Sequence, residues 1–379
     1  MYSSLLSCLN KRKDHLCNPT GWGWVLRDPV VGCFAPALYQ LDKEGCIHLL
    51  HMERKTYEKL YWQNTAFWIR REHKLRPVLA QLEDLDIDLI PLKGAALLKT
   101  VYKNIGLRLM TDVDVLVRHK DFLQTARVLL DRDFQPKWAY PSGDLFEFVS
   151  LPIEYWPGEL SFYNGDGLHL DLHQDLITYH WFKVPYPTDM NMVWARTIQA
   201  EELTSENHQQ LWKIFLSPYD MLAHMCLHLA LHGIQMVKNL WDVDLFLRKL
   251  PENWDWKMYI MTAEIWGLKS ATYHAFSFCQ EIFGTPIPDD VISALKPPDF
   301  DRWQVRKLIT PETLLADKKT FGKRYPTLVK FALFDNTIKK LKTIKNLIIP
   351  DPAWLENNST NHSIFGHWVH IIRVLLRGD

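Results

Sequence analysis

Three aspartates stand at spacings that favour metal-assisted chemistry. Asp112 and Asp114 alternate with valines in residues 112–117, and Asp171 alternates with leucines in residues 168–173. Because successive side chains of a strand point to opposite faces, each segment places its carboxylates on one face and its apolar residues on the other. We expect the apolar faces to pack on the core and the three carboxylates to face solvent. Carboxylate oxygens are the ligands that Mg²⁺ prefers, so the pattern predicts that Asp112, Asp114 and Asp171 are both metal ligands and catalytic groups.

A second group of residues is typical of phosphate binding. Lys93 and Gly94 follow a short apolar segment, residues 87–92, and precede a helix-favouring run. A glycine lets the chain turn sharply, and the first amides of a helix starting at Ala95 would be available to phosphate oxygens. Arg108 could bind the same oxygens with two parallel hydrogen bonds. Each feature alone is common in proteins without this function. Their order along the chain, ahead of the aspartates, favours phosphoryl transfer.

This order of motifs resembles the DNA polymerase β-like nucleotidyltransferase superfamily and, within it, the poorly characterised NTP_transf_5 family. The resemblance covers about residues 50–250. It rests on Leu92-Lys-Gly94, Tyr102, Arg108, the segments 112–117 and 170–173, Pro218-Tyr-Asp and Leu240-Trp-Asp-Val-Asp244.

The resemblance implies specific roles for residues of this chain. Asp112 and Asp114 would be metal ligands, Asp171 the third carboxylate, and Gly94 the residue next to the nucleotide phosphates. The cofactors would be two Mg²⁺ ions and the substrate an NTP, with ATP expected. One departure is that Gly94 is followed by Ala95, where the superfamily more often has serine or glycine. Backbone amides, Lys93 and Arg108 would then have to compensate for the missing hydroxyl.

The surrounding pattern predicts an α+β fold with a small mixed-sheet core. Apolar residues at helical spacing between about 53 and 85 indicate one or two amphipathic helices. Asn164-Gly-Asp-Gly167 predicts a tight hairpin turn, and the chain beyond residue 200 reads as helical. We therefore expect an N-terminal arm or cap at 1–52, a nucleotidyltransferase core at 53–200 and a helical domain at 201–379, with the substrate cleft between the last two.

Two further features allow more than one interpretation. His224, His228 and His232 share one helix face, with Asp242 and Asp244 on the following helix. They could bind a transition metal such as zinc, but a polar seam between helices or the floor of the cleft is favoured, because no HExxH motif frames them. The basic stretch 318–345 is expected to be a solvated helix face, with a polyanion or a membrane surface as the alternative.

Composition narrows the choice of partners and compartment. The 379 residues carry 44 Lys+Arg against 44 Asp+Glu, so no global field concentrates nucleic acid, and nucleic acid is disfavoured as a partner. No apolar run reaches the length that crosses a bilayer, and the first ten residues do not read as a signal peptide. We therefore expect a cytoplasmic protein. The six cysteines form no CxxC pair and are expected to be free thiols.

The predicted function is Mg²⁺-dependent transfer of an NMP from an NTP to a hydroxyl or phosphate, with release of pyrophosphate. The acceptor implied by the resemblance is a small molecule, a sugar or a peptide of a bacterial biosynthetic pathway. Two alternatives stay open: a non-catalytic protein that holds nucleotide, and a toxin-like transferase acting on tRNA or protein. The three intact aspartates argue against the first, and the neutral charge argues against the second.

Overall fold

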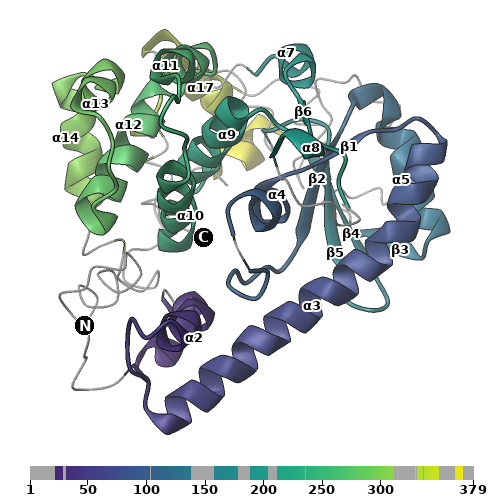
Figure 1. Ribbon diagram of the computed structural model, residues 1–379. Coiled ribbons are helices and arrows are strands. Elements are labelled where there is room, and N and C mark those ends of the chain that lie inside the picture. Colours follow the sequence, from purple (N-terminus) through teal and green to yellow (C-terminus); the bar gives the residue numbers. More distant parts are fainter. Residues whose placement is uncertain are drawn as a thin grey trace.

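The computed structural model describes residues 22–28, 31–102, 104–137, 158–177, 188–203, 211–234, 236–310, 314, 329, 331–335, 337–349 and 363–369. Figure 1 shows a sheet on one side and a group of helices on the other, with the long helix α3 running along the lower edge. The first 21 residues and much of the basic stretch 318–345 lie outside the described residues.

The core of the first half is a five-stranded mixed sheet with the strand order β1-β2-β5-β4-β3. β2 and β5 run parallel, and the other neighbours are antiparallel. The bounds of the strands are Leu89–Pro91 for β1, Val113–Val117 for β2, Phe134–Lys137 for β3, Glu159–Asn164 for β4 and His169–His173 for β5. Together with helices before and after it, this mixed sheet confirms the predicted α+β class.

The hairpin between β4 and β5 forms where the sequence predicts it. Gly167 has a φ of +76°, a left-handed conformation that glycine adopts without strain. The Asn164 side chain stabilises the turn, because its Oδ1 accepts hydrogen bonds from the amides of Asp166 (3.1 Å) and Leu168 (2.9 Å). This turn fixes the register that places Ser161 opposite Asp171.

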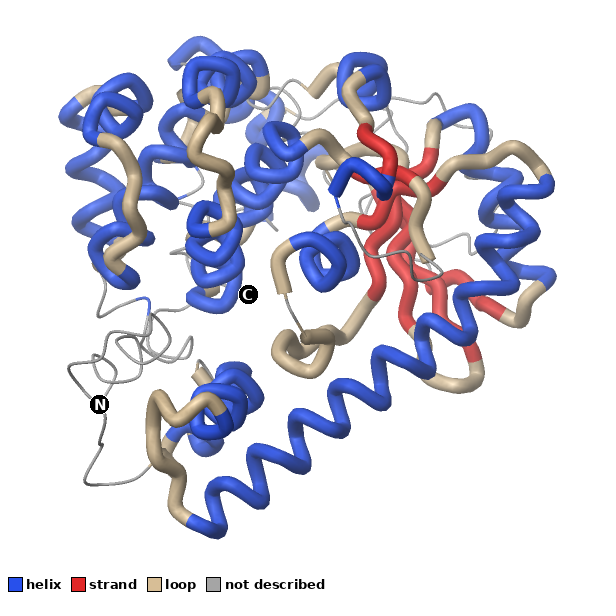
Figure 2. Tube along the Cα trace, in the orientation of Figure 1, coloured by secondary structure: helices blue, strands red, loops and turns tan. Residues whose placement is uncertain are grey.

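Four helices support the sheet and the segment before it. The expected helical region 53–85 is one 34-residue helix, α3 (His51–Asp84), and Figure 2 shows it running from α2 (Ala35–Lys43) to the far edge of the sheet. Glu53 links its first turn to the N-terminal segment, since its carboxylate accepts hydrogen bonds from the amides of Trp22 (2.7 Å) and Gly23 (2.6 Å). The other two helices are α4 (Lys93–Thr100) and α5 (Phe122–Asp131).

From residue 188 on, the described residues form helices and a small two-stranded sheet. That sheet pairs β6 (Ile198–Gln199) with β7 (Ile214–Phe215). The short helix α7 (Met190–Ala195) precedes β6, and the short helix α8 (Ala200–Leu203) follows it. The main helices are α9 (Pro218–Leu231), α10 (Val237–Arg248), α11 (Trp256–Ile265), α12 (Lys269–Phe278) followed by a π-helical turn (Cys279–Phe283), α13 (Asp289–Leu295), α14 (Asp299–Leu308) and α17 (Thr337–Ile348).

The expectation that the three aspartates face solvent is wrong for Asp114 and Asp171, whereas Asp112, just before β2, is half-buried. All five residues of β2 are buried, and Asp114 and Asp171 expose only 3% and 7% of their surface. The reason is that α9 and α10, which lie over a hundred residues later in the sequence, approach this face and enclose a cavity with it. A two-residue alternation reports which residues share a face, but it does not report what covers that face.

Candidate active site

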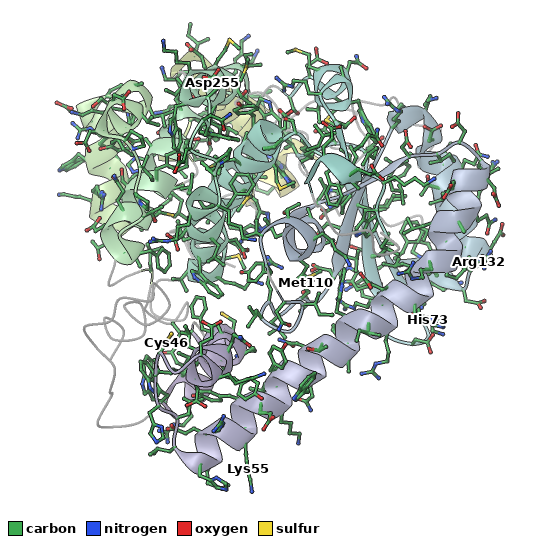
Figure 3. All side chains as sticks on the ribbon, viewed as in Figure 1. Cys46, Lys55, His73, Met110, Arg132 and Asp255 are labelled. Carbon is green, nitrogen blue, oxygen red and sulfur yellow. The ribbon has the colours of Figure 1, made fainter. Side chains whose placement is uncertain are left out.

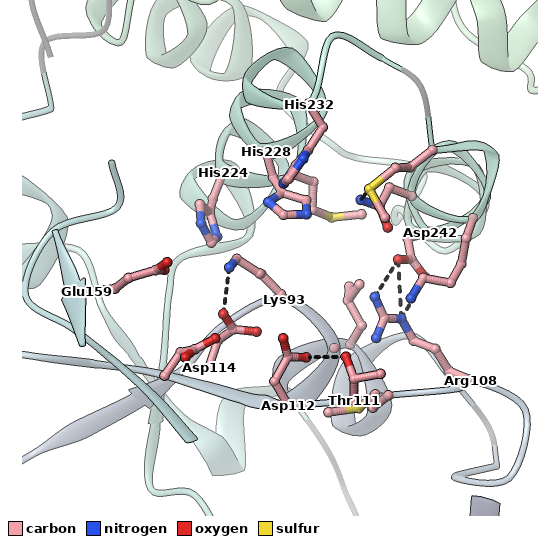
Figure 4. A pocket seen from close by; sticks show the side chains of 18 residues that line it. Lys93, Arg108, Thr111, Asp112, Asp114, Glu159, His224, His228, His232 and Asp242 are labelled. Atoms are coloured by element: carbon pink, nitrogen blue, oxygen red, sulfur yellow. Dashed lines mark hydrogen bonds and ion pairs between the residues drawn. The ribbon is translucent and has the colours of Figure 1, made fainter. Parts of the chain in front are cut away.

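The register of two parallel strands brings the three predicted aspartates to one face. Asp114 of β2 lies directly opposite Asp171 of β5, and Asp112 lies two residues before Asp114. Residues opposite each other in a parallel pair point to the same side, and so do residues two apart in one strand. Asp112, Asp114 and Asp171 therefore all line the same cavity. Figure 4 shows Asp112 and Asp114 projecting into it from below.

With nearby histidines, the carboxylates form two groups whose ligand atoms lie close enough together to hold a metal ion. In the first group, one ligand atom from each of Asp112, His169 and Asp171 lies within 4.8 Å of the others; Asp114, Glu159 and His173 form the second group in the same way. Four carboxylates thus meet around one cavity, and a concentration of negative oxygens of this kind suits hard divalent cations such as Mg²⁺. The residues present fit a metal-binding role.

Hydrogen bonds from the same strand and from neighbouring strands orient the carboxylates. His173 Nε2 lies 3.0 Å from Asp114 Oδ1, and His169 Nε2 lies 2.8 Å from Asp171 Oδ1. Ser161 on β4 also donates to Asp171 Oδ1, at 2.6 Å. These bonds leave the second oxygen of each aspartate available to a ligand and restrict the rotation of both side chains.

Lys93 provides the positive charge next to the carboxylates. Its Nζ lies 2.5 Å from Asp114 Oδ1. Burial alone would lower the pKa of Lys93, but the charges of Asp114 and Glu159 outweigh it and raise this pKa above its usual value. For Asp114, burial acts to raise the pKa, and the Lys93 ammonium and His173 lower it well below the usual range. Both groups are therefore charged at neutral pH.

The sharp turn before α4 is made by Lys93, where the sequence suggested Gly94. Lys93 has a φ of +47°, a region that costs a residue with a Cβ about 1 kcal/mol or more. The helix also begins at Lys93, two residues before the expected start. The Ala95 amide donates to the Leu92 carbonyl (3.1 Å) and Ala95 is fully buried, so this amide is already partnered.

Gly94 is required by the close approach of Arg108. A Cβ built on Gly94 would overlap the guanidinium of Arg108 and would come within 2.9 Å of the Met110 sulfur. Both side chains line the cavity, and Figure 3 shows Met110 near the middle of the molecule, between α10 and α3. A side chain at position 94 would therefore displace the arginine.

Arg108 is held by Asp242 in a buried ion pair. Arg108 Nε and Nη2 lie 3.0 Å and 2.8 Å from the two oxygens of Asp242, and Tyr102 donates to Asp242 Oδ1 at 2.6 Å. Burial opposes the charge of Arg108, but the adjacent carboxylate of Asp242 raises the pKa of the guanidinium above its usual value. The pair joins the loop before β2 to α10, across 134 residues of sequence. It leaves Nη1 directed at Gly94.

The opposite wall of the cavity comes from α9 and α10. The cavity has a volume of about 320 Å³, and the wall includes His224, His228, His232, Lys238 and Asp242. In Figure 4 the three histidines follow one another along α9 above the aspartates, so they line the cleft, which is one of the two roles expected of them. Burial, with the nearby Lys93 and His173, lowers the pKa of His224 to about 3, so its imidazole is neutral at pH 7.

Three residues make contacts at the site that the sequence did not predict. Glu159 lines the cavity and pairs with His173 Nε2 at 3.2 Å; its signal was its place at the start of the first hairpin strand. Arg71 of α3 is 3% exposed and donates to the Thr111 carbonyl, next to Asp112. Burial lowers the pKa of Arg71 to about 10, a shift that the Asp112 carboxylate opposes. The third is Asp242, which the sequence named in the motif Leu240-Trp-Asp-Val-Asp244 and beside the histidines, but not as the partner of Arg108.

A protein-family model matches the part of the chain that builds the site. The family model described as "Uncharacterised nucleotidyltransferase" (NTP_transf_5) matches residues 36–284. This range holds the sheet, α9, α10 and all the residues that line the cavity. No curated protein and no solved structure matches the chain. Within the described residues, no helix has the length and apolar character that a membrane span requires.

Proposed function

Because the chain belongs to the NTP_transf_5 family of nucleotidyltransferases, we propose that the aspartate cavity is its catalytic centre and that it transfers an NMP from a Mg²⁺-bound NTP. The observation that carries this proposal is the meeting of Asp112, Asp114 and Asp171 on one face above a cavity of about 320 Å³. ATP is the proposed nucleotide, and the proposed acceptor is a hydroxyl or phosphate of a small molecule, a sugar or a peptide.

Asp112, Asp171 and Asp114 would hold two Mg²⁺ ions, with Glu159 as a further carboxylate. When bound, the ions polarise the α-phosphoryl group and neutralise the charge that develops on the leaving pyrophosphate. The bond that forms joins the acceptor oxygen to the α-phosphorus, and the bond that breaks joins that phosphorus to the oxygen bridging to the β-phosphate. The acceptor proton is released, and pyrophosphate leaves.

The protein side chains position these reactants. Lys93 and the Nη1 group of Arg108 flank Gly94 at the start of α4, so they are placed to receive phosphate oxygens. His169, Ser161 and His173 restrain the aspartates before any substrate arrives, which reduces the ordering cost of the reaction. α9 and α10 cover the site and limit its access to bulk water.

Label transfer tests the proposal. Purified protein is incubated with Mg²⁺ and a panel of hydroxyl acceptors (sugars, sugar phosphates and serine-containing peptides), together with ATP labelled in either its α- or its γ-phosphate. We expect label from the α-phosphate alone to appear in an acceptor, and Asp171→Asn to abolish its appearance. Transfer of γ-label instead would mean that the protein is a kinase. Failure of the wild-type protein to bind a Mg²⁺-bound, non-hydrolysable ATP analogue in calorimetry would refute the nucleotide assignment itself.

A further inference from the structure

The outward face of α17 combines apolar side chains with lysines. Leu341, Ile344 and Ile348 expose 61%, 39% and 49% of their surface, and Lys342 and Lys345 are also exposed. The helix sequence, TIKKLKTIKNLI, contains no acidic residue. At 100° per residue, these five positions fall on one side of the helix. A solvated helix face would instead be polar, so this face departs from the expectation for the basic stretch.

A contact at one edge of this face orients α17. Lys340 pairs with Asp301 of α14 at 2.9 Å, and both side chains are less than 20% exposed. Lys340 lies beside Ile344 but about 100° around the helix from Leu341 and about 140° from Lys345, so the contact leaves Leu341, Lys342 and Lys345 directed away from α14. In Figure 1, α17 lies with α11 at the top of the molecule, far from the start of α3.

A second segment extends the same surface. The indole N–H of Trp368 donates to the carbonyl of Ile348, which places residues 363–369 against the end of α17. In that segment Phe365 is 74% exposed and Trp368 is 41% exposed. Aromatic side chains of this kind are enriched where proteins meet the interface of a membrane.

We propose that this surface, formed by Leu341, Lys342, Ile344, Lys345, Ile348 and Phe365, docks the protein on an anionic lipid bilayer. Lysines attract negatively charged headgroups, and apolar side chains on the same face enter the boundary between headgroups and acyl chains. At 1.5 Å per residue the 12-residue helix is about 18 Å long, too short to cross a hydrocarbon core of about 30 Å. It therefore lies in the plane of the interface.

Charge complementarity selects this partner over two others. A second copy of the chain would bring the same lysines against each other across a symmetric contact, and their repulsion would oppose association. A nucleic acid would satisfy the lysines but would leave four large apolar side chains without a suitable environment. An anionic bilayer accepts both kinds of side chain at once.

Vesicle flotation tests the proposal without reference to catalysis. Full-length protein is mixed with vesicles of pure phosphatidylcholine or of equimolar phosphatidylcholine and phosphatidylglycerol. We expect flotation with the anionic vesicles only, weakened by added salt. Lys342→Gln with Lys345→Gln should lower partitioning by about tenfold, and Leu341→Ser should lower it by a similar factor.

Matched controls lie on a distant face. Lys55 and Ile69 of α3 are both exposed, and Lys55 is labelled near the start of that helix in Figure 3. Lys55→Gln and Ile69→Ser should float as the wild type does. Equal flotation with both vesicle types, no flotation at all, or full flotation of the α17 variants would each overturn the proposal. So would a Leu341-dependent dimer seen by light scattering, or tighter binding to homopolymeric RNA than to anionic vesicles.

Discussion

Removing the negative charge of Asp242 tests how the two halves of the cleft are joined. In Asp242→Asn, Arg108 keeps its charge but loses the carboxylate that holds Nε and Nη2, and Tyr102 loses its acceptor charge. Arg108 is only 8% exposed, so solvent compensates little for the lost charge. Breaking a buried ion pair in this way costs about 3–5 kcal/mol. For a chain of this length that corresponds to a fall in melting temperature of about 4–6 °C.

A double-mutant cycle measures the interaction energy between Arg108 and Asp242. Arg108→Met should destabilise the protein strongly, whereas Arg108→Met combined with Asp242→Leu should lose less than the sum of the single losses, because no unpaired charge stays buried. Arg248→Lys is the matched control, since its pair with Asp244 lies on the same helix and Arg248 is 31% exposed. Because lysine keeps the positive charge beside Asp244, that control should cost less than Asp242→Asn does.

Nucleotide affinity tests whether Arg108, besides pairing with Asp242, also binds phosphate oxygens. Arg108→Lys should weaken binding of a Mg²⁺-bound ATP analogue by about tenfold to a hundredfold, because lysine lacks the planar fork that pairs with Asp242 through two nitrogens while a third reaches a phosphate. Calorimetric titration well below the melting temperature gives this number. Strictly additive losses in the cycle would refute the coupling of Arg108 and Asp242. Unchanged nucleotide affinity in folded Arg108→Lys would leave that residue a purely structural role.

Three further predictions concern the aspartate face. Asp112→Asn should abolish nucleotidyl transfer without lowering the melting temperature of the metal-free protein, because it removes repulsion among carboxylates; a large drop in melting temperature would show a structural role. Gly94→Ala should weaken binding of the ATP analogue, because the new Cβ displaces the Arg108 guanidinium, and an unchanged calorimetric affinity would contradict this. The pKa of Asp114 is depressed in the folded state, so its stabilising contribution is complete above its unfolded pKa of about 4 and is lost as the pH falls below that value. In acid melts between about pH 5 and 2, Asp114→Asn should therefore lose less stability than the wild type, and equal slopes would count against the Lys93 pairing.

The sequence by itself determined which side chains share a strand face. The alternation of residues 112–117 and 168–173 places Asp112 with Asp114 and His169 with Asp171, whatever the rest of the chain does. The Asn164-Gly167 turn fixed the pairing of the two hairpin strands in the same local way. Family membership could also be predicted, because the motifs that carry it occur in order along the chain.

Only the tertiary structure showed which side chains and helices pack against those strand faces. The sequence predicted that Gly94 makes the turn before the helix, but the left-handed residue is Lys93, and Gly94 is needed because Arg108 approaches it closely. Asp242 reaches Arg108 across 134 residues, and α9 closes over a face that alternation alone presented as solvated. The physical reason is that strand periodicity depends on neighbours two residues apart, whereas the partners of a buried charge depend on how distant helices pack against the sheet.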